Sequence, residues 1–116
     1  AEVIFLDFDG VLVKNSSKFA LTPWEYEPIE ENLSAISEKL KQCKSSSVVI
    51  TTSRPSTELN NIAEFLKKYQ ISPKQIVCDL PHCKRLLVND FSASNPFPSA
   101  LSVNMPRNAS NLADYL

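Results

Sequence analysis

Two aspartates near the start of the chain have the type and spacing of groups that do chemistry. Asp7 and Asp9 follow an apolar run at residues 3–6 and stand directly before Gly10, the only glycine in the sequence. Alternate side chains of an extended segment share a face, so both carboxylates can point into one cleft. Two carboxylates this close repel each other unless a divalent cation neutralises them or one keeps its proton and acts as a general acid. The pair therefore predicts a metal site, an acid–base site or both.

A third carboxylate, Asp90, follows another apolar run at residues 86–88. If it arrives from a neighbouring strand, it completes an oxygen-rich site of the kind that Mg²⁺ prefers. The structural alternative is capping of a turn by aspartate, but the predicted strand before Asp7 favours chemistry. A calcium loop fits less well, because Gly10 comes too early for an EF-hand and no glutamate stands at the twelfth position.

The composition excludes several classes of site. A Walker-type phosphate loop or a G-x-G-x-x-G dinucleotide fingerprint needs two or three glycines, and this chain has 1. The 12 basic and 13 acidic side chains give a net charge of -1, which offers no general field for nucleic acid or an anionic membrane. Recognition of phosphate must therefore be local.

The length of 116 residues predicts a single domain, residues 1–116, with a core of its own. The 3 cysteines, an odd and small number, predict reduced thiols and a cytoplasmic protein. No apolar run approaches about 18 residues and no charged-then-apolar leader is present, so we expect no membrane association. Cys78, His82 and Cys83 suggest zinc, but a structural zinc site needs four ligands, so packing and loop roles are favoured.

The apolar pattern indicates the elements that must position these residues. Five short apolar runs predict strands over residues 3–6, 48–50, 76–78, 86–88 and 100–103. The first, second and fourth are continuous, as in strands buried on both faces of a parallel sheet. Apolar residues at helical spacing predict two helices, over residues 29–43 and 59–69. The alternation predicts an α/β fold, with a doubly wound, mainly parallel Rossmann-like sheet and helices on both faces.

In such a sheet, ligands bind beyond the carboxyl ends of the strands. Polar residues stand at the predicted ends of four strands: Asp7 and Asp9, residues 51–54, Asp79, and Asn89 with Asp90. Nearly all of these groups suit a metal ion or a phosphate.

Three segments resemble motifs of the haloacid dehalogenase (HAD) superfamily. Residues 3–12, VIFLDFDGVL, are similar to its first motif, an apolar strand followed by Asp-x-Asp-Gly. Residues 48–55, VVITTSRP, resemble the second motif, a strand that ends in threonine or serine. Residues 86–90, LLVND, resemble the fourth, and Lys84 and Arg85 both stand where the single cation of the third motif is expected. The resemblance spans most of the chain.

The resemblance implies a role for each matching residue. Asp7 would attack phosphorus to form an aspartyl-phosphate, and Asp9 would protonate the leaving oxygen and then deprotonate the attacking water. Magnesium would be held by the Asp7 carboxylate, the Asp9 backbone carbonyl and the Asp90 carboxylate. A phosphoryl oxygen would accept a hydrogen bond from Thr52. The cation, Lys84 or Arg85, would stabilise the aspartyl-phosphate.

Four further residues are candidates for substrate binding by their place in these motifs: Gly10, Ser53, Arg54 and Asn89. Two features depart from the family pattern. Asn89 stands where many relatives have aspartate or glycine, and Ser94 or Asn95 replaces a later acid. We expect the loss of that acid to weaken magnesium affinity.

The gaps between the motifs are too short for a cap domain, so we expect an open cleft. Such a cleft suits a large substrate or a second subunit acting as a lid, and hence a homo-oligomer. Residues 13–28 form a predicted flap whose side chains reach toward a leaving group or pack at the surface; these are Lys14, Lys18, Trp24 and Tyr26.

These observations predict a magnesium-dependent phosphatase, a phosphomonoester hydrolase acting on a sugar phosphate or a larger phosphorylated substrate. Nucleic-acid 3′-phosphate ends would suit the open cleft, but the near-neutral charge disfavours them. Two alternatives belong to other classes. A receiver-like domain would phosphorylate an aspartate after the third strand, where Asp79 stands, and a catalytically weak phosphate-binding module would serve regulation or interaction.

Overall fold

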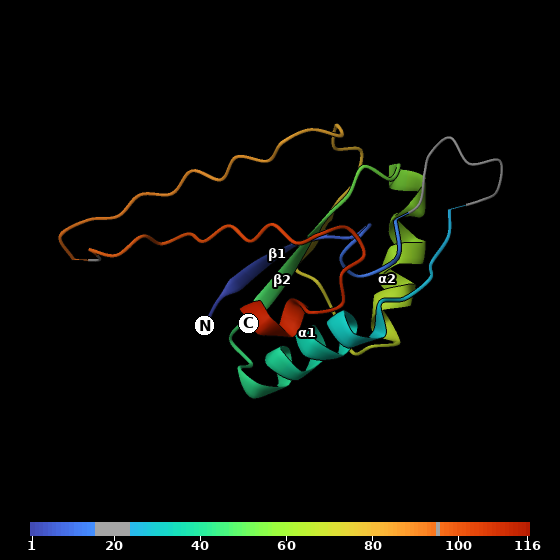
Figure 1. Ribbon diagram of the computed structural model, residues 1–116, viewed down its shortest axis with the longest axis horizontal. Helices are drawn as coiled ribbons and strands as arrows, with labels where there is room; N and C mark the ends of the chain where they lie inside the picture. Colours follow the sequence, from blue (N-terminus) through green and yellow to red (C-terminus); the bar gives the residue numbers. More distant parts are fainter. Residues whose placement is uncertain (16–23, 95) are drawn as a thin grey trace.

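The computed structural model describes residues 1–15, 24–94 and 96–116, so Lys18 and Asn95 lie outside the described residues. Three strands, two α-helices and two 3₁₀ turns follow one another along the chain (Figure 1): β1 Val3–Asp7, α1 Glu30–Gln42, β2 Ser47–Thr51, η1 Ser56–Glu58, α2 Leu59–Lys67, β3 Gln75–Val77 and η2 Leu112–Tyr115. The first three predicted strands and both predicted helices are confirmed. None of the described helices has the length and apolar character needed to cross a membrane.

The sheet has three parallel strands in the order β1-β2-β3. Leu6 pairs with Ile50, which in turn pairs with Ile76. Because the strands are parallel, their carboxyl ends meet at one edge, where Asp7 is level with Thr51. The α/β class is therefore confirmed, in the form of a small parallel sheet with two helices.

The core lies on one face of this sheet. Buried strand side chains share a single apolar cluster with residues of α1 and α2, and the members at its centre are Leu6, Val48, Ile50, Leu33, Ile36, Ile62 and Leu66. On the opposite face of β1, Val3 and Phe5 are 58% and 57% exposed. Two right-handed crossovers that step in the same direction across a sheet place both helices on the same face. The expectation of helices on both faces, and of a first strand buried on both, is not met within the described residues.

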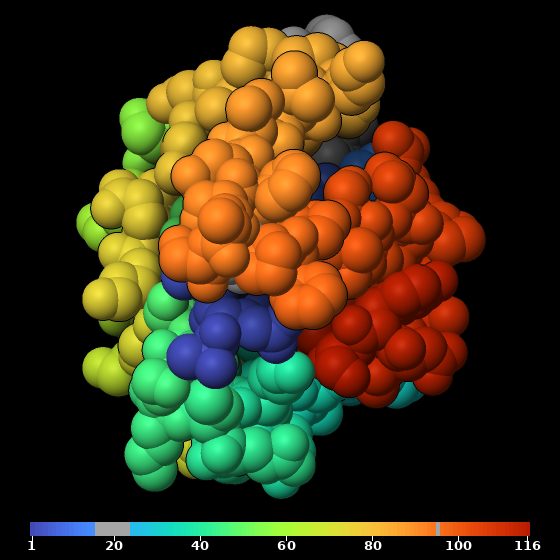
Figure 2. Space-filling view, turned by 90° about the vertical axis from the view of Figure 1, so that its left-hand side faces the viewer, coloured from blue at the N-terminus to red at the C-terminus, as the bar shows by residue number. Residues whose placement is uncertain are grey.

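The two remaining predicted strands, at residues 86–88 and 100–103, are not formed in this structure. The described residues of the segment 81–104, which we call the arm, are all exposed, and Leu86, Val88 and Leu101 are 80–83% exposed. Figure 1 shows the arm leaving the body of the molecule as two extended stretches, and Figure 2 views the molecule from the side to which it points.

The short connection after β3 explains why residues 86–88 do not form the predicted strand. The backbone N–H of Asp79 donates to the carbonyl of Arg54 (2.9 Å), and that of Leu80 donates to the carbonyl of Thr52 (3.2 Å), so the chain is still held at the carboxyl edge there. Only residues 81–85 then separate it from Leu86. A crossover to a full parallel strand usually takes a dozen or more residues, because the chain must first return to the amino end of the sheet.

The chain after the arm returns to the body through a buried amide. Asn32 in α1 is 0% exposed. Its Nδ2 donates to the carbonyls of Val11 (2.7 Å) and Ala109 (2.8 Å), and its Oδ1 accepts from the backbone N–H of Leu112 (3.1 Å). One side chain therefore joins the turn after β1, helix α1 and the C-terminal segment.

Replacing this amide is expected to destabilise the fold. Asn32→Ala leaves buried backbone groups without partners, which should lower the free energy of unfolding by about 3 kcal/mol. Urea unfolding measures this change, and Asn60→Ala, an exposed asparagine near the start of α2, is the matched control. Equal stability of the two variants would contradict the role of Asn32.

Candidate active site

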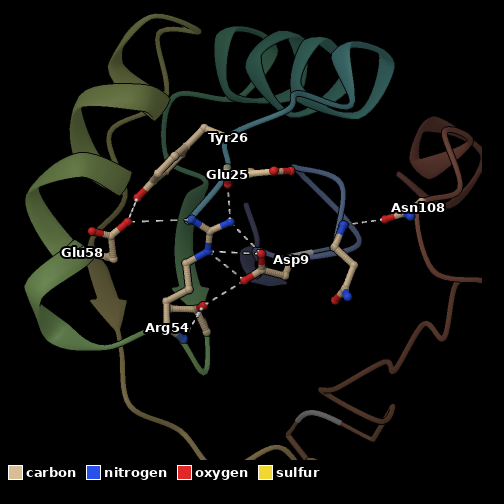
Figure 3. Close-up of polar contacts among 8 residues, drawn as sticks. Asp9, Glu25, Tyr26, Arg54, Glu58 and Asn108 are labelled. Carbon is tan, nitrogen blue, oxygen red and sulfur yellow. Dashed lines mark hydrogen bonds and ion pairs between the residues drawn. The ribbon is translucent and has the colours of Figure 1, made fainter. Parts of the chain in front are cut away.

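The candidate site lies at the carboxyl ends of β1 and β2 (Figure 3). Hydrogen bonds continue beyond the last residues of the strands: the backbone N–H of Phe8 donates to the carbonyl of Thr51, and that of Thr52 donates to the carbonyl of Val77, both at 3.0 Å. The loops after the strands therefore begin side by side, and the residues they carry are brought into contact.

Gly10 turns the chain immediately after the two aspartates. Its φ is +85°, a conformation that L side chains rarely adopt, and an added Cβ would lie 3.3 Å from Cγ of Arg107. Its N–H donates to the carbonyl of Val13 (2.7 Å), and its carbonyl accepts from the N–H of Asn108 (2.8 Å). Gly10, a predicted substrate-binding residue, is buried in this turn.

The Asp9 carboxylate is held by the loop after β2. Arg54 Nη2 donates to Oδ1 (2.8 Å), and Arg54 Nε lies 3.1 Å from both Oδ1 and Oδ2. The Thr52 hydroxyl donates to Oδ2 at 3.3 Å and accepts from the Arg54 backbone N–H at 3.0 Å. The predicted site residues Asp9, Thr52 and Arg54 thus form one hydrogen-bonded cluster.

Arg54 is fully buried, with 0% exposure. Its Nη2 also donates to the backbone carbonyl of Glu25 (2.5 Å), and its Nη1 lies 4.0 Å from Oε1 of Glu58. Aromatic rings surround its Cζ atom, with centroids at 5.1, 5.0 and 4.6 Å: those of Phe8, Trp24 and Tyr26. We predicted Arg54 as a substrate contact, but in this structure the guanidinium faces protein groups on all sides.

Tyr26 and Glu58 complete the surroundings of Arg54. The Tyr26 hydroxyl donates to Glu58 Oε1 at 2.9 Å. Burial raises the pKa of Tyr26 to about 12, and the hydrogen bond to Glu58 adds to this shift, so the hydroxyl keeps its proton. The predicted flap residues Trp24 and Tyr26 therefore pack on Arg54. Glu58 was missed from the sequence, although its place four residues after Arg54 is a common ion-pair spacing.

Asp7 remains exposed at the edge of the sheet. Partial burial by the surrounding chain raises the pKa of its carboxyl group, and the neighbouring Asp9 raises it further. Arg85 and, to a smaller extent, His82 oppose this rise in the pKa of Asp7. The charge of Arg85, one of the two candidate cations, therefore acts on Asp7.

Arg85 is folded onto its own loop. Its Nη1 donates to the carbonyls of Pro81 (2.8 Å) and Cys83 (2.7 Å), and the residue is exposed. Lys84 beside it is also exposed. The sequence analysis did not predict that His82 acts on Asp7. The only signal in the sequence was its position two residues before Lys84, a candidate cation of the site.

The structure does not bring Asp90 to the other carboxylates. Asp90 and Asn89 lie in the exposed arm, where the Asp90 carbonyl accepts a hydrogen bond from Ser99 Oγ (2.7 Å). Across the described parts of the chain, no group of three or more His, Cys, Asp or Glu side chains is placed to hold a metal ion. Ser53 is exposed between Thr52 and Arg54, so it faces the solvent at the same edge as Asp7.

Asp79, the residue that a receiver-like domain would phosphorylate, has a local structural contact. Its Oδ2 accepts from the backbone N–H of Ser56 at 3.2 Å, where η1 begins, and its φ is +61°. Its carboxylate therefore joins the segment after β3 to the start of η1, which lies between β2 and α2.

Comparisons with known proteins add no assignment. No family model matches the chain, and no curated protein or solved structure is significantly similar to it. The resemblance to the HAD superfamily stays a prediction from the motifs.

The raised pKa of Asp7 predicts how stability depends on pH. A carboxyl group whose pKa is raised by folding stabilises the folded state below its ordinary pKa of 3.8, and this stabilisation is lost as the pH rises through the raised value. Asp7→Asn, which stays uncharged, should therefore unfold at a higher urea concentration than the native protein at pH 7. Near pH 3 the two proteins should unfold at the same urea concentration.

Glu38→Gln, which neutralises an exposed carboxylate on α1, is the control for a general charge effect. An Asp7→Asn variant that is less stable than the native protein at pH 7 would contradict the prediction.

Proposed function

We propose that the protein is a magnesium-dependent phosphatase of the HAD type, a phosphomonoester hydrolase that works through an aspartyl-phosphate. One observation carries the proposal. An exposed carboxylate, Asp7, ends β1 beside a second carboxylate, Asp9, which groups of the neighbouring loop hold in place. A nucleophile needs access to its substrate, whereas an acid–base group needs a fixed position, and the two aspartates differ in this way.

The residues of the cluster have distinct roles in this proposal. An Asp7 oxygen attacks phosphorus as the bond to the leaving oxygen breaks. Asp9 enters this cycle with a proton on Oδ2, while Oδ1 stays paired with Arg54, and gives that proton to the leaving oxygen. Asp9 then takes a proton from the water that hydrolyses the aspartyl-phosphate, which frees inorganic phosphate. Arg85, whose charge already acts on Asp7, offsets the negative charge of the phosphoryl group.

Thr52 is fully buried in this structure, so in this proposal its hydroxyl would donate to a phosphoryl oxygen only after it turns away from Asp9. Its present bond to Asp9 is 3.3 Å long, beyond the usual range for a hydroxyl donor, so it can be exchanged at little cost. Arg54 would still hold both oxygens of Asp9 after this exchange.

The residues present fit a magnesium site in part. The Asp7 carboxylate and the Asp9 carbonyl are hard oxygen donors of the kind Mg²⁺ binds, and the Asp9 side chain is already neutralised by Arg54. When bound, the ion would screen the anionic nucleophile from the anionic substrate. The third ligand would be Asp90.

Closure of the arm on the free edge of β1 would bring Asp90 to Asp7. Among the described strands β1 pairs with β2 alone, so its other edge has room for this segment. Residues 81–85 span at most about 17 Å when extended, enough to reach the carboxyl half of β1. Residues 86–90 would then lie at the carboxyl end of β1 without forming a full parallel strand, because the connection is too short for one.

The exposed position of Asp7 supports a sugar phosphate or a larger phosphorylated molecule as substrate, with a second copy of the chain as a cover of this edge of the sheet. The net charge of -1 disfavours nucleic acid. The described cysteines are all free, which supports a cytoplasmic location. The carboxylate of Asp79 is engaged by Ser56, which argues against a receiver-like domain.

We expect the protein to hydrolyse 4-nitrophenyl phosphate with Mg²⁺ and to lose this activity with EDTA. Asp7→Asn should lower kcat by on the order of 10³-fold or more, because the nucleophile is gone. Asp114→Asn, an exposed aspartate near the C-terminus, is the matched control and should keep full activity.

Turnover by Asp7→Asn would contradict the mechanism. A phosphoryl group found on Asp79 by mass spectrometry, after treatment with acetyl phosphate, would favour the receiver-like domain. Phosphate binding without turnover would favour the non-catalytic module.

Asp90 gives a separate prediction about the arm. Asp90→Asn should raise the Mg²⁺ concentration for half-maximal activity about tenfold, because a ligand is lost. In the native protein, Mg²⁺ should slow amide hydrogen exchange at residues 86–88, and in Asp90→Asn it should not. Exchange that is unaffected by Mg²⁺ in the native protein would contradict closure of the arm.

A further inference from the structure

We propose that Arg54 is a positioning residue for Asp9, which fixes the carboxylate in the orientation needed to protonate the leaving oxygen. This inference rests on the proposed function, because it assigns how the acid–base group of that reaction is held. It also changes the role of Arg54, which by its place in the sequence was a candidate to bind substrate.

The contact between the two side chains restricts rotation of the carboxylate. Arg54 Nε lies 3.1 Å from both oxygens of Asp9, and Nη2 lies 2.8 Å from Oδ1. A guanidinium presents its N–H groups in a rigid planar fork, so these contacts fix the plane of the carboxylate as well as its distance. The Asp9 side chain keeps 13% exposure, which leaves it an open side toward a substrate.

Arg54 can serve as a fixed point because its own position is set by several groups. Its side chain has 0% exposure, and it meets the Glu25 carbonyl at 2.5 Å and Glu58 at 4.0 Å. The Tyr26 ring centroid lies 4.6 Å from Cζ, within the range of a cation–π contact. Removing one partner of a buried ion pair is strongly destabilising, so the guanidinium has little freedom to leave Asp9.

The same contacts join three parts of the chain at the acid–base group. Asp9 follows β1, Arg54 follows β2, and Glu25 and Tyr26 belong to the segment before α1. The position of Asp9 therefore depends on side chains that do not touch the substrate, and Arg54 is the residue through which they act.

A positioning role predicts a dependence on the leaving group. An alkyl phosphate has a poor leaving group, which needs a proton as the bond to phosphorus breaks. The 4-nitrophenolate group leaves without one. A misplaced acid therefore slows formation of the aspartyl-phosphate from the alkyl ester and has little effect on the aryl ester. The parameter kcat/KM reports this first step for both substrates.

The test compares Arg54→Lys and Arg54→Gln with the native enzyme on a simple alkyl phosphate and on 4-nitrophenyl phosphate. Both variants should lose about 10²-fold in kcat/KM on the alkyl ester and less than about threefold on the aryl ester. Lysine keeps the charge but lacks the fork, so it should not restore the rate. An equal loss on both esters, no loss on either, or full activity of Arg54→Lys would overturn the inference.

Tyr26→Phe is the matched control. It removes the hydrogen bond to Glu58 but keeps the aromatic ring and every contact to Asp9. It should change kcat/KM for the two esters by the same factor, and a selective loss on the alkyl ester would overturn the assignment to Arg54. Thermal unfolding of each variant checks that it is folded at the assay temperature.

A second measurement separates this inference from the proposed function. If the native protein hydrolyses neither ester, the proposed function fails, and the ¹³C resonance of the Asp9 carboxyl group still reports its environment. Arg54→Gln should shift or broaden this resonance, whereas Tyr26→Phe should leave it in place. An unchanged resonance in Arg54→Gln would overturn the positioning role.

Discussion

The buried ion pair between Arg54 and Asp9 constrains the rest of the molecule. Taking a guanidinium out of water is unfavourable by several kcal/mol unless its charge and its donors are matched. Asp9 and the Glu25 carbonyl match the charge and the donors on Nε and Nη2, and aromatic faces cover much of the remaining surface. Nη1 has no hydrogen-bond partner among the described residues and lies 4.0 Å from Oε1 of Glu58. Because Asp9 follows β1 and Arg54 follows β2, the pair holds the two loops together at the edge where the strands end. The segment before α1 is fixed to the same point. The candidate site is therefore part of the packing of the molecule and does not rest on a separate loop.

The structure also leaves apolar surface without a partner. The core occupies one face of the sheet, and on the other face of β1 the side chains of Val3 and Phe5 are exposed. The arm carries further exposed apolar groups, with Asp90 as its one charged residue between 86 and 104. Burying apolar surface stabilises a fold by about 25 cal/mol per Å², so an uncovered sheet face and an apolar arm in one chain favour contact between them. Contact with this face would hold the arm close to the sheet, as the proposed closure at the edge of β1 requires.

The sequence analysis succeeded where the signal was local and failed where it depended on distance along the chain. Helical spacing of apolar residues located α1 and α2, and continuous apolar runs located β1 and β2, since these patterns reflect burial on nearby elements. Residues 86–88 have the same apolar character as β1, yet they form no strand, because pairing depends on whether residues 81–85 can return the chain to the sheet. In the site, the spacing of Asp7 and Asp9 correctly indicated where the two carboxylates lie, at the end of β1. The burial of Arg54 was not predictable, because a charged residue gives no sign of which partners will surround it.

The scarcity of glycine affects how rigid the site is. Left-handed backbone conformations are usually supplied by glycine, but here Asp79 and Asn108 adopt them, with φ of +61° and +65°. Their side chains bind backbone groups that a glycine would leave free: Asp79 accepts from Ser56, and Asn108 Oδ1 accepts from the N–H of Asn15 at 2.8 Å. The turns at Asp79 and Asn108 are therefore anchored by their own side chains. Gln70, after α2, also has a φ of +61°. Gly10 has no side chain to anchor its turn, and a Cβ there would lie 3.3 Å from Cγ of Arg107. A chain that fixes its turns in this way can hold the Asp9 carboxylate in place with side-chain contacts, without a glycine-rich loop.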